Sequence, residues 1–204
     1  MTAAPAGFPP RVDGRRQRRE QNRRTVVEAL LARYDAGDYE PGIASIATDA
    51  ALSPRSVFRY FDDLDDLAMA AIEHQQQRLA PLWNLDIDPD APVAERVGTF
   101  VDQRSGLLDA MGHVGRVARL RASTRPLVAA EVARVRARLR SQVAETFAAE
   151  LAGLASADAQ ARLDAADVAC SFESNDLMRQ QGFDGDRSRR AMVVALDALF
   201  GIRR

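Results

Sequence analysis

Apolar residues recur at intervals of three and four along nearly the whole chain, and no stretch alternates convincingly between apolar and polar residues as a half-buried strand would. One such series runs from Val128 through Val132, Val135 and Leu139 to Val143. This spacing places the side chains on one face of a helix. The sequence therefore predicts an all-α fold.

The composition excludes several kinds of chemistry. All 28 positive charges are arginine, and the absence of lysine excludes a Schiff base and a Walker A phosphate loop. The single cysteine, Cys170, excludes an internal disulfide, and His74 and His113 lack the spacing of metal ligands. We therefore expect no metal and no cofactor. No apolar run approaches the roughly 18 residues of a membrane span, and no signal peptide is apparent, so we expect a cytoplasmic protein without a membrane partner.

Positive charge is concentrated near the N-terminus. Residues 11–24 hold seven arginines against two acidic residues, although the whole chain has a net charge of −1. A basic segment on an otherwise acidic protein indicates a polyanionic partner. Charge alone does not distinguish DNA, RNA and an anionic membrane surface. Prolines and glycines within residues 1–14 predict a flexible, arginine-bearing arm.

The segment after this arm predicts three helices of unequal length: a long one from Arg15 to the stop at Gly37, one of about eight residues at 43–50, and one of about seven at 54–61. Ser53 is a predicted N-cap with Pro54 at the first helical position. A joint of only three residues, 51–53, holds two helices at a large angle, as in a helix-turn-helix.

A fourth helix is predicted from an aspartate cap, Asp62 or Asp63, to about Leu79. A loop follows at 84–92, and helices are then predicted at 93–110, 114–122, 126–151, 158–181 and 186–200. Two arginine clusters, within 116–125 and 134–140, spread around their helices and are expected to be solvated.

The run Ile46-Ala47-Thr48-Asp49-Ala50-Ala51-Leu52-Ser53, continued by Pro54-Arg55-Ser56-Val57-Phe58-Arg59-Tyr60-Phe61 and then Leu67, resembles the DNA-binding signature of the TetR family of bacterial transcriptional regulators. The resemblance implies a three-helix DNA-binding domain at 15–75 and a helical-bundle domain for ligand binding and dimerisation at 76–204, after the arm at 1–14. The family pattern differs at three positions: Ala51 replaces a glycine, Phe58 replaces a phosphate-contacting tyrosine, and Leu64, flanked by aspartates, replaces a lysine.

The function implied by the resemblance is a ligand-responsive regulator, a repressor rather than an enzyme, that binds a palindromic DNA operator as a homodimer. The dimer would form through the last two helices, at Val168, Phe172, Met178, Met192, Val193, Leu196, Leu199 and Phe200. The effector would be an unidentified small molecule. Two alternatives remain open at this point: an all-α enzyme that uses the C-terminal cavity, and a helical adaptor whose basic arm binds nucleic acid or membrane.

The predicted DNA-binding residues are polar side chains of the first three helices: Arg15, Arg16, Arg18, Arg19, Ser45, Thr48, Ser53, Arg55, Ser56, Arg59 and Tyr60. We expect the first four arginines to compensate for the aspartates around Leu64, which repel phosphate. For Tyr60 the alternative is packing against Phe61 or the fourth helix. The predicted ligand pocket comprises Trp83, Phe100, Met111, His113, Phe147 and Phe172, for which an ordinary core is the alternative.

Overall fold

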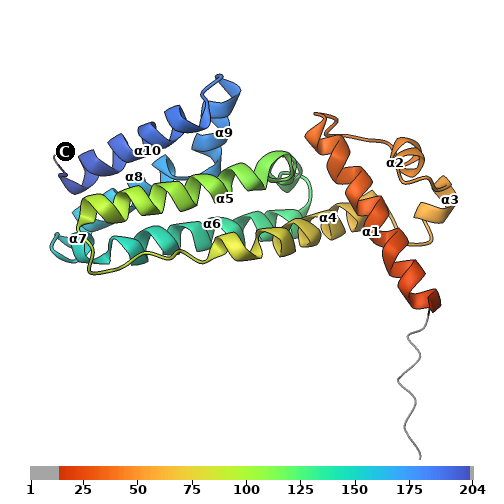
Figure 1. Ribbon diagram of the computed structural model, residues 1–204, viewed down its shortest axis with the longest axis horizontal. Coiled ribbons are helices and arrows are strands. Elements are labelled where there is room, and N and C mark those ends of the chain that lie inside the picture. The colour runs from red at the N-terminus through yellow and green to blue at the C-terminus, as the bar shows by residue number, and fades with distance from the viewer. Residues whose placement is uncertain (1–13, 203–204) are drawn as a thin grey trace, which may run out of the picture. The chain divides into compact units, whose positions relative to one another are not determined.

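The computed structural model describes residues 14–202, and every regular element in that range is a helix (Figure 1). The predicted all-α fold is confirmed. The chain divides into two compact units, whose described parts are residues 14–71 and 72–202, and the boundary falls within helix α4 (Leu64–Leu79). None of the described helices combines the length and the hydrophobicity that crossing a membrane requires.

The first unit contains α1 (Gly14–Asp35), α2 (Ile43–Asp49), α3 (Pro54–Val57) and the first turns of α4. Its core takes one apolar face from each helix, and Ala47 lies among these side chains where α1, α2 and α3 approach. The buried residues include Val26, Leu30, Tyr34, Ile46, Val57, Phe61 and Leu67. Since α2 and α3 are too short to be stable alone, this shared core holds them in place.

Two predicted helix caps are confirmed. The Ser53 side chain accepts a hydrogen bond from the Ser56 backbone N–H at 3.2 Å, which fixes the start of α3 at Pro54. The Asp63 carboxylate accepts from the backbone N–H groups of Asp65 and Asp66, both at 2.8 Å, and so begins α4. Each side-chain cap satisfies donors that lack a partner within the helix.

The third helix is shorter than the predicted seven residues. It ends at Val57, and the chain then tightens through hydrogen bonds from the Arg59 N–H to the Ser56 carbonyl and from the Tyr60 N–H to the Val57 carbonyl, three residues back. Bonds of this spacing are typical of a 3₁₀ turn. The tighter turn places both Tyr60 and Phe61 on the buried side.

The residue that joins α2 to α3 has a left-handed backbone conformation. Ala51 has φ of +54°, and the Leu52 N–H beyond it donates to the Ala47 carbonyl at 2.9 Å. This arrangement is typical of a helix end that glycine prefers, because a Cβ crowds the backbone there. Alanine at this position therefore carries a conformational cost.

We expect Ala51→Gly to raise the free energy of unfolding by about 0.5–1 kcal/mol, because glycine relieves the crowding at positive φ. The neighbouring Ala50 has φ of −78°, so Ala50→Gly is a matched control that should destabilise the protein. Chemical denaturation followed by circular dichroism measures both variants. A lower stability for Ala51→Gly would contradict the assigned strain.

The second unit continues α4 into the 3₁₀ turn η1 (Ala80–Trp83). A loop then leads to α5 (Val93–Ala122), α6 (Pro126–Thr146), α7 (Ala148–Ala152), α8 (Ser156–Ala169), α9 (Phe172–Gln180) and α10 (Gly185–Phe200). Within this unit α5 packs against both α6 and α10 (Figure 1). Phe147 lies at the centre of the core, 5.4 Å from Phe100 and 4.5 Å from Phe200 between ring centroids.

One predicted helix break is confirmed and two others were missed. Gly112, with φ of 47° and ψ of −142°, kinks α5 between the predicted segments 93–110 and 114–122. The predicted single helix over 126–151 is wrong, because Phe147 departs from helical geometry and separates α6 from α7. The predicted helix over 158–181 is also interrupted, where Ser171 caps a new helix, α9.

Candidate nucleic-acid interface

The side chains of α3 and the following turn divide between core and solvent. Val57 and Phe61 are buried, whereas Arg55, Phe58 and Arg59 are exposed. The exposed three are spaced by three and four residues, so they share one outer face. The predicted outward positions of Arg55 and Arg59 agree with the structure. Phe58, with 52% of its surface exposed, is an apolar member of this face that sequence reasoning did not include.

Ser53 and Ser56 stand at the start of this face. Their hydroxyl oxygens lie 3.0 Å apart, and Ser53 is also the helix cap. On α2, the Ser45 hydroxyl donates to the Gly42 carbonyl and the Thr48 hydroxyl donates to the Ala44 carbonyl. A hydroxyl hydrogen can rotate toward another acceptor, so each of these four residues could donate a hydrogen bond to an acceptor oxygen of a ligand.

Tyr60 occupies a buried position, which favours the packing alternative over DNA contact. Only 7% of its surface is exposed, and its hydroxyl accepts hydrogen bonds from Asn22 Nδ2 and Arg59 Nη2, both at 2.8 Å. The bond from Asn22, followed by that from Arg59, lowers the pKa of Tyr60. The Tyr60 hydroxyl thus links Arg59 to Asn22 of α1, and Tyr60 itself does not form part of the outer surface.

Two arginines of α1, Arg33 and Arg23, position the helix-turn-helix, and neither was predicted to have this role. Arg33 forms ion pairs with Asp49 of α2 at 2.7 Å and with Asp38 at 3.1 Å. Its bond to Asp49, followed by that to Asp38, raises the pKa of Arg33. Arg23 donates to the Tyr60 carbonyl at 3.1 Å and lies 4.6 Å from the centroid of the Phe61 ring. These contacts fix α2 and the end of α3 against α1.

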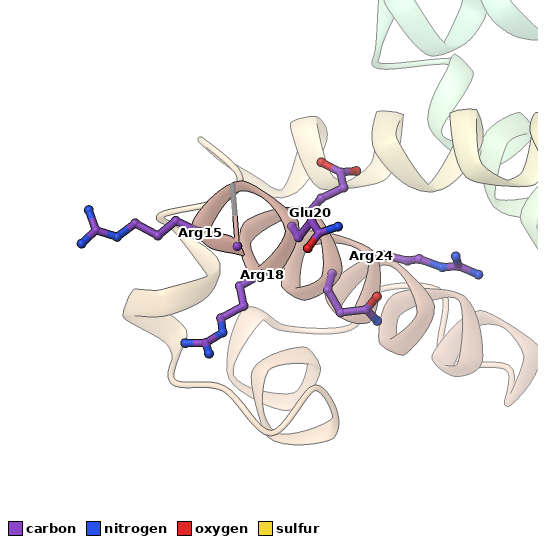
Figure 2. Close-up of a pocket in the computed structure, with 7 residues that line it drawn as sticks. Arg15, Arg18, Glu20 and Arg24 are labelled. Carbon is purple, nitrogen blue, oxygen red and sulfur yellow. The ribbon is translucent and has the colours of Figure 1, made fainter. Parts of the chain in front are cut away.

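The predicted basic cluster lies on the first two turns of α1. Arg15, Arg16, Arg18 and Arg19 are all exposed, and Figure 2 shows Arg15 and Arg18 extending away from the helix. A surface hollow of about 860 Å³ follows these turns, and it is lined by Gly14, Arg15, Gln17, Arg18, Glu20, Gln21 and Arg24 (Figure 2). The predicted flexible arm lies outside the described residues apart from Gly14.

Positive charge at a helix N-terminus opposes the helix dipole. The first turn of α1 has no acidic residue, and arginines occupy the places where acidic side chains would stabilise the helix. By contrast, α4 begins with Asp65 and Asp66 in its first turn, the usual preference. The described first turn of α1 therefore concentrates arginine charge without an acidic residue.

The aspartates around Leu64 act within the fold. Asp63 caps α4, the Asp62 N–H donates to the Asp66 carboxylate, and Arg23 lies 4.0 Å from that same carboxylate. Arg23 thus partly compensates the acidic charge at this edge. The departure from the family lysine is accommodated structurally, although carboxylates would still repel a phosphate.

The residues predicted to line a ligand pocket do not surround a single cavity. Phe100, Phe147 and Phe172 are buried in the packed core of residues 72–202, as the alternative proposed. Trp83 lines a pocket of about 460 Å³, whereas Met111 lines a separate cavity of about 40 Å³. His113 is half-buried beside the kink at Gly112 and lines neither of these two cavities. Cys170 is buried, and burial raises the pKa of its thiol to about 12, which leaves it unreactive at neutral pH.

Comparison with known proteins gives a likeness of fold. No protein-family model and no curated protein matches the sequence. A transcriptional regulator from Rhodococcus sp. Rha1 is 15% identical, with 88% of this chain and 96% of that chain covered at a TM-score of 0.66. A TetR-like transcriptional regulator from Rhodococcus sp. RHA1 is 21% identical, with 90% and 96% covered at a TM-score of 0.63. The chain therefore has the fold of the TetR-like transcriptional regulators.

Proposed function

We propose that the chain is a TetR-family regulator that binds double-stranded DNA and represses transcription in response to a small-molecule effector. The observation that carries this proposal is the exposed face of Arg55, Phe58 and Arg59, on the short, capped helix α3 and the turn that follows it. A helix fits the major groove of DNA, where arginine reads guanine and apolar groups contact the thymine methyl. Ser53 and Ser56 at the start of α3, and Ser45 and Thr48 on α2, would contact phosphates.

The arginines at the start of α1 would supply electrostatic affinity. We expect their joint replacement, Arg15, Arg16, Arg18 and Arg19→Gln, to make the plot of log K against log salt concentration shallower by about 0.9 for each phosphate contact that is lost. Fluorescence anisotropy with a labelled duplex at several salt concentrations measures the slope. A matched control replaces four exposed arginines beyond residue 72, Arg125, Arg134, Arg187 and Arg190, with the same change of net charge. An unchanged slope in the α1 variant would contradict this role.

Dimerisation would use the outer surface of the last three helices. Phe172, Met192 and Leu196, predicted for the interface, instead lie in the core of their own unit because they face α5 and its neighbours. Val168, Leu177 and Val194 remain exposed on α8, α9 and α10. We assign the interface to these three exposed apolar side chains. Two recognition helices would then reach half-sites about 34–36 Å apart on a palindrome.

We expect Val194→Arg to convert a dimer into a monomer, since it adds a charge to a side chain that is 67% exposed and outside the core. Light scattering after size-exclusion chromatography measures the mass. Leu127→Arg is the matched control, because Leu127 is 72% exposed at the start of α6 and lies outside the assigned interface. A monomeric wild-type protein, or a dimer in both variants, would contradict the assignment.

Regulation would follow from a shift between two populations of the dimer. An effector that binds more tightly to the form with wrongly spaced recognition helices lowers DNA affinity by the ratio of its affinities for the two forms. Regulation of this kind requires an effector site in residues 72–202 and DNA contacts in residues 14–71.

Competition binding distinguishes the proposed regulator from the two alternatives. The DNA upstream of the protein's own gene is labelled and challenged with an excess of unrelated duplex, single-stranded RNA or anionic vesicles. Retention of the labelled fragment supports sequence-specific binding by a regulator. Equal displacement by every polyanion would instead identify a helical adaptor, and turnover of a small molecule would identify an enzyme.

A further inference from the structure

A pocket of about 460 Å³ lies between the segment that follows η1 and one side of α6, entirely within residues 72–202. Its volume falls within the range of small-molecule sites. One wall is formed by Trp83 and residues 84–89, and the other by residues 138–146. The pocket is separate from the core residues Phe100, Phe147 and Phe172.

The segment after Trp83 contributes its apolar side chains, and not its acidic ones, to the pocket. Leu85, Ile87 and Pro89 line the pocket, whereas the intervening Asp86 and Asp88 do not. Alternate residues of an extended segment point to opposite sides, which explains the separation. A pair of hydrogen bonds with Gln103 of α5, at 2.9 and 3.0 Å, anchors the backbone of Asp86. The apolar wall is therefore held in place.

The opposite wall is polar and belongs to one face of α6. Its residues are spaced by three and four: Arg138, Ser141, Gln142, Glu145 and Thr146. Gln142 is 8% exposed, and its amide is held at both ends, donating to the Trp83 carbonyl at 2.7 Å and accepting from Arg104 Nη2 at 3.0 Å. This buried amide connects the pocket to the arginine behind it.

The guanidinium that lines this pocket has no acidic partner within residues 14–202. Arg138 lies 4.4 Å from the centroid of the Trp83 ring and forms no ion pair in the described part of the chain. The acidic residue of the lining, Glu145, instead accepts a hydrogen bond from the Ser141 hydroxyl at 2.6 Å. Arg104 lies behind this wall, where it is fully buried and does not line the pocket. Arg138 is therefore the group that offers a ligand both positive charge and hydrogen-bond donors.

We infer that this pocket binds a small carboxylate with an apolar body. The carboxylate pairs with Arg138, because a guanidinium binds carboxylate oxygens through parallel hydrogen bonds. The apolar body contacts Leu85, Ile87 and Pro89. Arg138 would repel a cationic ligand of the same shape, and a neutral amide offers it one uncharged acceptor oxygen in place of two that share a negative charge.

Trp83 is the only tryptophan of the chain, so its fluorescence reports directly on the pocket. The experiment titrates the full-length protein with benzoate and hexanoate, whose bodies are flat and extended, at constant ionic strength and without DNA. The amides and amines of the same skeletons serve as neutral and cationic probes. We expect a saturable change with at least one carboxylate, at a Kd near or below ~1 mM for ligands of this size, and a weaker or absent response to the other probes.

Two arginine variants test the site itself. Arg138→Gln should weaken carboxylate binding by about tenfold, because a hydrogen bond to a charged group is lost. Arg134→Gln is the matched control, since Arg134 is exposed on the same helix, pairs with Glu131 and does not line the pocket. Calorimetry repeats the titrations so that the change at Trp83 is matched to binding.

The inference is overturned if neither carboxylate saturates, if amides or amines bind as tightly, or if Arg138→Gln binds like the wild type. All of these titrations are carried out without DNA, so their outcome does not depend on the proposed DNA-binding function. If a carboxylate binds but the protein does not retain specific DNA, the ligand-binding inference is supported and the proposed regulator function is contradicted.

Discussion

Replacing both exposed arginines of the helix-turn-helix, Arg55→Ala with Arg59→Ala, should lower the affinity for a specific DNA site by at least about 30-fold. Each arginine that reads a base edge contributes about 1–3 kcal/mol, so the loss of two reaches this size even at the low end of the range. Both side chains are exposed, and the core residues Val57 and Phe61 are unchanged. The variant should therefore retain the helical content of the wild type.

Anisotropy titrations with specific and unrelated duplexes at one salt concentration measure this effect. Arg134→Ala is the control for the loss of a surface arginine. Tyr60→Phe separates base contact by Arg59 from the orientation of the Arg59 side chain. This change removes only the hydroxyl that accepts hydrogen bonds from Asn22 and Arg59. We expect a smaller loss from Tyr60→Phe than from Arg59→Ala. An unchanged affinity in the double arginine variant would show that Arg55 and Arg59 do not contribute to DNA binding.

Replacing the buried arginine of α5, Arg104→Ala, should lower the free energy of unfolding by about 3–5 kcal/mol. Arg104 is fully buried, and its guanidinium donates to two backbone carbonyls and to the Gln142 amide. Alanine leaves these oxygens without a donor and opens a cavity beside Phe100. Burial lowers the pKa of Arg104 to about 10, so the side chain is still charged at neutral pH.

Urea unfolding followed by circular dichroism measures this loss. Arg104→Met fills part of the volume but supplies no donor, so it should be intermediate between alanine and the wild type. The surface change Arg134→Ala should alter stability by less than about 1 kcal/mol. A loss of that small size for Arg104→Ala would show that the hydrogen bonds of Arg104 do not hold α5 to α6 and to the end of α8.

The helix-turn-helix was predictable because local chemistry determines it. Ser53 and Asp63 carry side chains that cap helices, and a joint of three residues leaves few conformations for the chain between α2 and α3. The TetR signature that the sequence resembles has glycine at position 51, and Ala51 adopts the positive φ that glycine favours. Gly112 likewise indicated the kink of α5. At each of these positions a residue type constrains its own backbone.

The breaks at Phe147 and after Ala169 could not be predicted in the same way. The apolar period of α6 continues across Phe147, but this residue leaves helical geometry to pack between Phe100 and Phe200. Where α8 ends, the carbonyl of Cys170 accepts a hydrogen bond from Arg104, 66 residues earlier in the chain. Partners from distant segments fix both breaks, and one sequence does not reveal such pairings.

The arginine clusters were predicted only in part: Arg134, Arg136 and Arg138 are exposed as expected, whereas several other members are half-buried for a related reason. Their spacing around the helix predicted solvated side chains, yet Arg116 pairs with Asp176 at 2.6 Å and Arg119 pairs with Glu173 at the same distance. Arg140 similarly joins α6 to Asp164 and Asp167 of α8. Helical spacing gives the direction of a charge but not the neighbour that packs there. The same limit applies to Tyr60, whose partner Asn22 lies 38 residues away.

Selection from a random library of duplex DNA by the full-length protein shows whether the exposed face of Arg55, Phe58 and Arg59 reads a DNA sequence in a dimer. We expect enrichment of an inverted repeat whose half-site centres lie about 10–10.5 base pairs, or a multiple of that, apart. The Arg55→Ala, Arg59→Ala variant should enrich no such sequence. Recovery of unrelated sequences by the wild-type protein, or of the same repeat by the variant, would mean that this face does not read DNA.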